Sequence, residues 1–297
     1  MADNEKSIYI KEQRENRKKN MRSFWRRLCK NKGAVFGLIV IAILTLIAIF
    51  AGLIAPWHTV IEQNARARLQ KPNMQHWFGT DTYGRDVFAR VINGTRISLL
   101  IGISCAGFCL LVGGFFGAAA AYFGGRFDNI VMRFMDMLMA IPATLLALTI
   151  VAALGTNMVN LVLAIAISNT PRFVRLVRSS VLTQVGQDYI EAARASGSGH
   201  LRIIFKDIIP NAMGPIIVET TQNLSHMILT ASSMSYIGMG VQPPNPEWGA
   251  MISEAREVMR YEPYLIIIPG MFIIFAALSF NLLGDGLRDA LDPRLKN

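Results

Sequence analysis

Residues 189–197 read Tyr-Ile-Glu-Ala-Ala-Arg-Ala-Ser-Gly and form a polar, helix-forming stretch between two apolar blocks. A polar segment in that position predicts a loop that folds outside the membrane. Asp188 can act as the N-cap of a short helix, with Glu191 reaching back to the cap in a variant of the capping box. Ala192 and Ala193 are good helix formers, and their small side chains allow a neighbouring surface to approach the backbone closely.

This helix is predicted to stop at Gly197, because glycine tolerates the left-handed turn that commonly ends a helix. A second short helix fits residues 200–207 and should end near Pro210, since proline lacks the backbone donor that a helix interior needs. The loop as a whole covers residues 183–210. A small helix–turn–helix of this kind on a membrane protein is typical of a docking device.

Apolar residues dominate the chain and occur in blocks. Hydrophobic residues make up 52% of the 297 positions and charged residues 17%, a more apolar composition than that of a typical soluble domain. A block of about 20 residues is long enough to cross a bilayer core of ~30 Å as a helix. The sequence therefore predicts an all-α, polytopic membrane protein with about six transmembrane helices, at 33–55, 97–123, 137–154, 158–168 (continuing through 177), 212–237 and 265–283.

Positive charge is unevenly distributed between the segments that join these spans. With the N-terminus inside, the cytoplasmic segments carry 22 of the 30 Lys and Arg residues and the external segments carry 8. The positive-inside rule therefore favours an N-in, C-in topology. The net charge of +10 is then a signal of topology and of contact with anionic lipid. Nucleic-acid binding is not indicated, because no recognition module is present.

These boundaries divide the chain into five parts. They are a cytoplasmic tail with a basic and aromatic interfacial helix at 1–32, a first span at 33–55, an external segment at 56–96, a transmembrane core at 97–284, and a cytoplasmic tail at 285–297. Within the core, an external loop is expected at 239–263. Its proline-rich start, 242–246, should be extended, and an apolar stripe predicts an amphipathic helix over 247–260.

The first external segment contains three potential metal ligands, His76, Asp81 and Asp86. The simpler interpretation is a loop on the membrane surface, in which the two carboxylates bond to local amides. A metal site formed by the three side chains is the alternative.

The loop at 183–210 resembles the signature of the membrane permease subunits of ABC importers. Glu191-Ala192-Ala193 and Gly197 match that signature in register, and Ile209-Pro210 stands where Leu-Pro is usual. Asp207 departs from the pattern, which generally has isoleucine there. In that family the segment is a coupling helix that inserts into a cleft on the ATPase subunit. The resemblance therefore implies ATPase docking through Asp188, Glu191, Ala192, Ala193, Gly197 and Pro210, whereas the alternative is an ordinary cytoplasmic helical hairpin.

Further motifs narrow the resemblance to the dipeptide/oligopeptide permeases, and within them to the "C" subunit of the paired permeases. They are Gly-Thr-Asp at 79–81, Gly-Arg-Asp at 84–86, Pro-x-Trp-Gly at 246–249 and the run at 281–293. The resemblance implies the type I permease fold and a bacterial inner-membrane location. It also implies a homologous second permease, two ATP-binding subunits and an extracytoplasmic substrate-binding protein. The family imports peptides, but close relatives carry nickel or glutathione.

The sequence lacks the motifs of a self-contained ATPase or an intramembrane hydrolase. It contains neither Gly-x-x-x-x-Gly-Lys-Ser/Thr nor His-Glu-x-x-His or Gly-x-Ser-x-Gly. We therefore expect this chain to be no enzyme and to bind no cofactor or metal. ATP and Mg²⁺ would be used by the partner ATPases.

The fifth predicted span carries an unusual number of polar residues along one helical face. Such groups are costly in hydrocarbon and normally face a bundle interior, a partner helix or water. The stripe is therefore either a wall of the translocation path or a seam with the partner subunit. A self-sufficient transporter, with Glu219 and His226 as a proton relay, is a second class of function, but the sequence shows no inverted repeat to support it. The stripe consists of Glu219, Gln222, Asn223, His226, Thr230 and Ser233.

Overall fold

The computed structural model describes residues 22–291, and within this range the chain is helical apart from its turns and loops. An isolated bridge between Thr80 and Asp86 is the β-type pairing found there. Residues 22–30 are helical and belong to the tail in which an interfacial helix is predicted. The rest of the N-terminal tail and the end of the C-terminal tail lie outside the described residues.

Six helical stretches correspond to the six predicted blocks. They are α2 (Lys32–Ile54), the continuous α4 (Val87–Phe108), η2 (Cys109–Gly113) and α5 (Gly114–Phe123), the pair α6 (Gly125–Met139) and α7 (Ala143–Leu154), α8 (Met158–Val185), α11 (Ile209–Tyr236), and α13 (Tyr264–Leu291). In the described part of the chain, three helices (α2, the stretch 87–123 and α13) are long and apolar enough to cross a membrane, or four if α6 and α7 form one span. The all-helical, polytopic fold is confirmed.

The third predicted span is not a straight helix. We expected a span at 137–154 after a cytoplasmic loop, but α6 already begins at Gly125 and meets α7 at an angle of 83°. Pro142 stands directly before α7, and proline both lacks a backbone donor and keeps the preceding residue from helical geometry. The sharp turn into α6 is made by Gly124 and Gly125, which both have positive φ.

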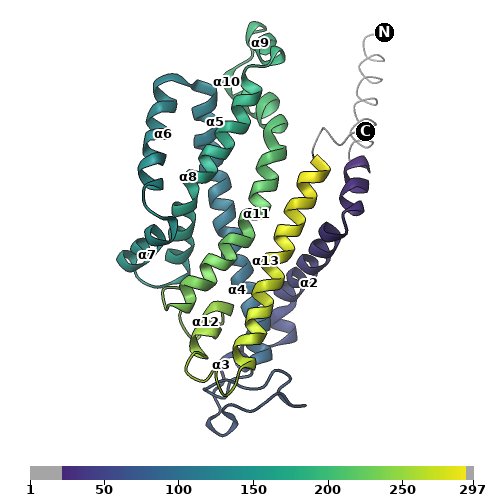
Figure 1. Ribbon diagram of the computed structural model, residues 1–297, viewed down its shortest axis with the longest axis vertical. Coiled ribbons are helices and arrows are strands. Elements are labelled where there is room, and N and C mark those ends of the chain that lie inside the picture. The colour runs from purple at the N-terminus through teal and green to yellow at the C-terminus, as the bar shows by residue number, and fades with distance from the viewer. Residues whose placement is uncertain (1–21, 292–297) are drawn as a thin grey trace.

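Helix α11 lies in the middle of the bundle and packs against α13, α4 and α8, while α2 packs on α13 and the α6–α7 pair lies at the opposite edge (Figure 1). Small residues allow these close crossings. A Cβ added at Gly117 would lie 2.6 Å from the carbonyl oxygen of Val174, and one at Gly37 would lie 2.5 Å from that of Ser279. Glycine is therefore required where these two helix pairs touch.

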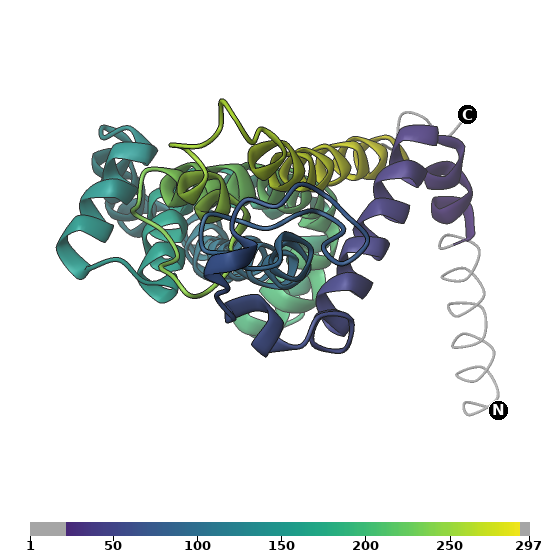
Figure 2. The same ribbon diagram turned by 90° about the horizontal axis from the view of Figure 1, so that it is seen from below.

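The two ends of the bundle differ in what they carry. The start of α2, the end of α13 and the short helix α9 (Asp188–Ala195) lie at one end, as the N-in, C-in topology requires (Figure 1). The opposite, external end carries α3 (Trp57–Ile61), η1 (Ala65–Ala67) and α12 (Trp248–Glu254). Seen from below, the loops of the first external segment lie across this end (Figure 2).

The external amphipathic helix is shorter than predicted. We expected it over 247–260, but α12 ends at Glu254 and residues 255–261 form turns. Glu247 caps the helix by accepting a hydrogen bond from the Ala250 amide at 2.9 Å. Ala255 is buried after the last turn, so the chain leaves the helix there to pack its apolar residues against the bundle.

Candidate functional site

The predicted docking segment is a protruding knob formed by α9, the turn after it and α10 (His200–Arg202) (Figure 1). Its N-terminus differs from the expectation, because Gln187 and not Asp188 is the N-cap, and no side chain caps the helix. Asp188 and Glu191 instead lie in the first turn, where a negative charge is favoured by the helix dipole. The predicted capping box is therefore wrong, since the helix begins one residue earlier than expected and leaves Asp188 inside it.

The end of α9 agrees with the prediction. Gly197 has a φ of +77°, the left-handed conformation that glycine adopts without steric cost. The Gly197 amide donates to the carbonyl of Arg194 and the Ser198 amide donates to that of Ala193, at 3.0 and 3.1 Å. This pair of bonds is a Schellman motif, which satisfies the last carbonyls of the helix.

The second helix of the knob does not end near Pro210 as predicted. It passes from α10 through the π-helical stretch η3 (Ile203–Ile208) into α11, with Pro210 in the first turn of α11. In η3 the Ile209 amide donates to the carbonyl of Ile204, five residues back. A π-helical turn contains one residue more than an α-helical turn. The chain therefore stays helical from α10 into α11 although Pro210 lies in the first turn of α11.

The knob is attached to the bundle by few contacts. Ile190 is fully buried, whereas Glu191 and Ala192 are exposed and Ala193 is partly so. The Tyr122 hydroxyl, at the end of α5, lies 2.8 Å from Nδ1 of His200, and the Arg194 guanidinium lies over the Tyr122 ring at 5.2 Å. Sequence reasoning missed Tyr122, because nothing in the sequence pairs it with residues more than 70 positions away.

The polar stripe of α11 divides into two halves. In the half nearer the knob, Oε1 of Glu219 accepts from Asn223 at 3.1 Å and pairs with Arg172 of α8 at 3.2 Å. Gln222 donates to Asp285 of α13 at 2.8 Å. These three stripe residues are thus engaged within the chain, and the partner of Glu219 is Arg172, which lies inside the fourth predicted span.

The other half of the stripe is open. His226 and Ser233 are exposed and Thr230 is partly exposed. With Thr144 and Leu148 of α7, they line a hollow of about 360 Å³, which we call the inner hollow. The structure therefore does not bring the six predicted residues together at one site.

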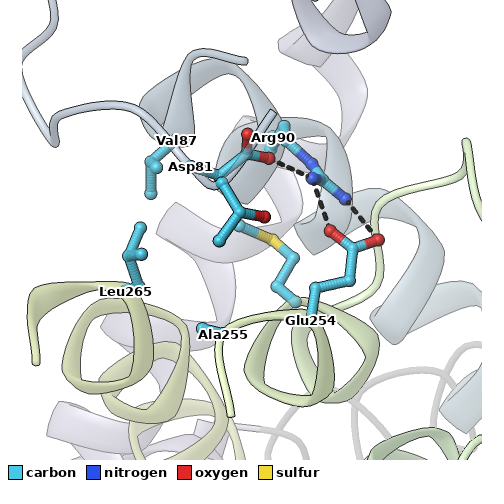
Figure 3. A pocket seen from close by; sticks show the side chains of 8 residues that line it. Asp81, Val87, Arg90, Glu254, Ala255 and Leu265 are labelled. Atoms are coloured by element: carbon cyan, nitrogen blue, oxygen red, sulfur yellow. Dashed lines mark hydrogen bonds and ion pairs between the residues drawn. The ribbon is translucent and has the colours of Figure 1, made fainter. Parts of the chain in front are cut away.

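The external end contains a buried group of four charges that the sequence did not reveal, which we call the external charge network. Figure 3 shows its members Asp81, Arg90 and Glu254. Asp81 accepts from Arg85 at 2.6 Å and also binds Arg90. Glu254 of α12 accepts from Arg90 at 2.8 Å and from Arg85. Two positive and two negative charges therefore balance, and they join the start of α4 to α12.

The alternative of a metal site in this segment is not supported. Nδ1 of His76 lies 2.7 Å from Oδ2 of Asp86, whereas Asp81 is turned to the two arginines of the network. Within residues 22–291, no three His, Cys, Asp or Glu side chains gather in a way that could hold a metal ion.

Two family models match the chain. Residues 112–297 match the binding-protein-dependent transport system inner membrane component. Residues 20–72 match the N-terminal TM domain of oligopeptide transport permease C.

Curated relatives match nearly the whole chain. The dipeptide transport system permease protein DppC of Alkalihalophilus pseudofirmus is 44% identical over 276 residues, which is 93% of this chain and 90% of that protein. The di/tripeptide transport system permease protein DppC of Pseudomonas aeruginosa is 41% identical and covers 93% of each chain. The glutathione transport system permease protein GsiD of Pectobacterium atrosepticum is 42% identical over 93% of this chain and 92% of that protein.

A solved structure shares the fold. The inward-facing MetNI methionine ABC transporter contains a chain that aligns with a TM-score of 0.56 at 16% identity, over 68% of this chain and 97% of that one. At this identity the likeness concerns the fold alone.

Proposed function

The chain belongs to the family of binding-protein-dependent transport system inner membrane components, and on this premise we propose that it forms half of the translocation path of an importer for di- and oligopeptides. It is a multi-pass permease subunit of an ABC importer in the bacterial inner membrane. The observation that carries the peptide assignment is the 41–44% identity to dipeptide and di/tripeptide permeases over 93% of the chain.

The proposed assembly contains two permeases, two ATPases and an external binding protein. A permease of this family works with a second permease and with ATPase subunits, which bind ATP and Mg²⁺ in place of this chain. The exposed face of α9, with Glu191 and Ala192, is the surface that we assign to the ATPase. The external end would receive the substrate from the binding protein.

Motion at the ATPase would reach the spans by two routes that start at the knob. One runs from His200 and Arg194 through Tyr122 into α5. The other runs through η3 directly into α11, because the chain is continuously helical there. The central helix would then move with the ATPase.

Other cargoes and one other class of transporter are the alternatives to a peptide importer. Glutathione is one alternative substrate, because the glutathione permease GsiD is 42% identical to this chain. Nickel is another, because the family that the chain resembles includes nickel carriers. A self-sufficient proton-coupled transporter is disfavoured. Glu219 is paired with Arg172 and lies seven residues, or roughly 10 Å of helix, from His226, too far for direct proton transfer.

Uptake by the reconstituted complex tests the substrate. Proteoliposomes that contain both permeases and both ATPases should import a labelled dipeptide only with internal ATP and loaded binding protein outside. The matched control carries an ATPase variant that binds but does not hydrolyse ATP. Import of glutathione or nickel without import of dipeptides would replace the peptide assignment.

Cysteine labelling tests whether the open half of the stripe lines the path. With the native Cys29, Cys105 and Cys109 replaced, His226→Cys and Thr230→Cys should react with a small water-soluble thiol reagent, and trapped ATP should change the rate. Gln222→Cys is the matched control and should react more slowly, because the side chain at position 222 packs against α13 at Gly284. Absence of labelling at His226, with disulfide formation to cysteines on the partner permease, would identify a dry subunit seam instead.

A further inference from the structure

A second hollow lies at the external end of the molecule, beside the proline-rich loop. It measures about 420 Å³ and is bordered by α4, by the start of α8 and by residues 241–245. We call it the outer hollow. The inner hollow lies between α7 and α11. The outer hollow is lined by residues 156–158, which follow α7, and by residues 241–245, which follow α11. The two hollows are therefore successive spaces along one side of the bundle.

Arg96 is the charged residue of the outer hollow. It is exposed, and the structure gives it no ion pair or hydrogen bond among residues 22–291. Arg90, on the same helix, is instead bound by Asp81 and Glu254. Of the described residues that line the outer hollow, none is acidic. The positive charge of Arg96 is thus uncompensated where the hollow opens.

The polar side chains around Arg96 offer hydrogen-bond acceptors. Asn93 uses its amide nitrogen to donate to the carbonyls of Ala55 and Ala89, and Gln242 donates to those of Gly238 and Gly240. The amide oxygens of Asn93 and Gln242 therefore remain to accept a bond from a ligand. The rest of the lining is largely apolar and includes Trp57, Met158 and Pro243.

An arginine beside two amide oxygens matches the C-terminal end of a peptide. A C-terminal carboxylate accepts hydrogen bonds and carries a negative charge, and guanidinium groups bind carboxylates with planar, paired hydrogen bonds. The last amide N–H of a peptide needs an acceptor beside that carboxylate, which Asn93 and Gln242 can supply. We infer that the outer hollow binds the C-terminal carboxylate of the transported peptide through Arg96, an assignment that rests on the proposed function and extends it to a subsite.

A neighbouring hollow provides a contrast within the same end of the molecule. It measures about 400 Å³ and is lined by Glu62, Asp86, His76 and Gln75 among others. Its carboxylates repel an anion, whereas Arg96 attracts one to the outer hollow. We call it the acidic hollow and use it as the control.

The first experiment measures the electrostatic potential in the outer hollow, and it needs no knowledge of the substrate. In a chain without native cysteines, Thr156→Cys is labelled with an anionic and a cationic methanethiosulfonate reagent of similar size. The anionic reagent should react faster, and Arg96→Gln should lower the ratio of the two rates by about threefold or more, as loss of one nearby charge requires. Arg96→Lys should retain the ratio. At Gln75→Cys, in the acidic hollow, Arg96→Gln should leave the ratio unchanged.

The second experiment asks whether the charge is used for the substrate. The reconstituted complex imports a peptide and its C-terminal amide, and the two uptake rates are compared at subsaturating peptide. Arg96→Gln should reduce the preference for the free acid by about tenfold, the range expected for loss of a charged hydrogen bond, and Arg96→Lys should restore part of it. An unchanged labelling ratio, or an equal loss of uptake for acid and amide, would overturn the subsite.

Two further outcomes separate the alternatives. If Arg96→Gln prevents co-purification of the partner permease, Arg96 pairs with a carboxylate of that subunit and the substrate assignment is wrong. If the wild-type complex imports neither peptide, the proposed peptide function fails, whereas the labelling ratio still reports whether the hollow attracts anions.

Discussion

The two ends of this protein are attached to the helical bundle by different kinds of contact. At the cytoplasmic end, α9 has one buried residue, Ile190. The other contacts of the knob include those of Tyr122 with His200 and Arg194 and the exposed hydrogen bonds of Tyr189. At the external end, the charge network joins α4 to α12 through buried, multiply bonded arginines. The side chains of the knob are thus held to the bundle by fewer bonds than α12, which the charge network fixes to α4.

Breaking the external charge network should give the largest effect. Glu254→Gln removes one of its two negative charges and leaves Arg85 and Arg90 with Asp81 alone, and an uncompensated buried charge costs about 3–5 kcal/mol. The free energy of unfolding should fall by about that amount, measured as thermal or denaturant unfolding of the purified protein in detergent.

Glu257→Gln is the matched control for this change. Glu257 is exposed, three residues further along the same segment, and surface substitutions usually change stability by less than about 0.5 kcal/mol. Equal stability of the two variants would mean that the network does not hold α12 in place.

Straining the knob should have a smaller effect on stability but a clear effect on transport. Gly197→Val places a β-branched residue at a φ of +77°, which costs about 1–3 kcal/mol of local strain. We expect normal membrane insertion with uptake uncoupled from ATP hydrolysis, measured as peptide import and ATPase activity of the same proteoliposomes.

Gly199→Val is the control for this variant. Gly199 has an extended conformation with a φ of −66° and a ψ of 150°, which valine adopts readily, and no atom lies within 4 Å of its added Cβ. Uptake should therefore remain near wild type. Full coupling in the Gly197 variant would show that the turn does not transmit force.

Removing one hydrogen bond between the knob and α5 should give the smallest effect. Tyr122→Phe keeps the ring under Arg194 but deletes the bond to His200, a loss of about 0.5–1.5 kcal/mol. We expect unchanged assembly and a modest decrease in peptides imported per ATP hydrolysed. Tyr261→Phe, at a side chain that is 77% exposed, should leave this ratio unaltered, and an equal decrease in both variants would contradict a specific role for Tyr122.

Local features of the chain were predictable from the sequence because they depend on near neighbours. The turn at Gly197 follows from the conformational freedom of glycine, and the helical blocks follow from runs of apolar residues. The N-cap of α9 was misplaced by one residue, from Asp188 to Gln187. The bend before α7 was missed, although Pro142 was a visible signal for it.

The sequence by itself determined the helical membrane fold, its orientation and the family resemblance, since these depend on composition, charge placement and short motifs. Tertiary structure alone decided which charges meet. It divided the α11 stripe by placing Arg172 and Asp285 beside the half nearer the knob. It also joined Arg90 to Glu254 while leaving Arg96 free of a partner within residues 22–291. Helical periodicity assigns a residue to a face, but the neighbour of that face comes from another part of the chain. Packing alone therefore fixed whether each polar group is paired or open to a ligand.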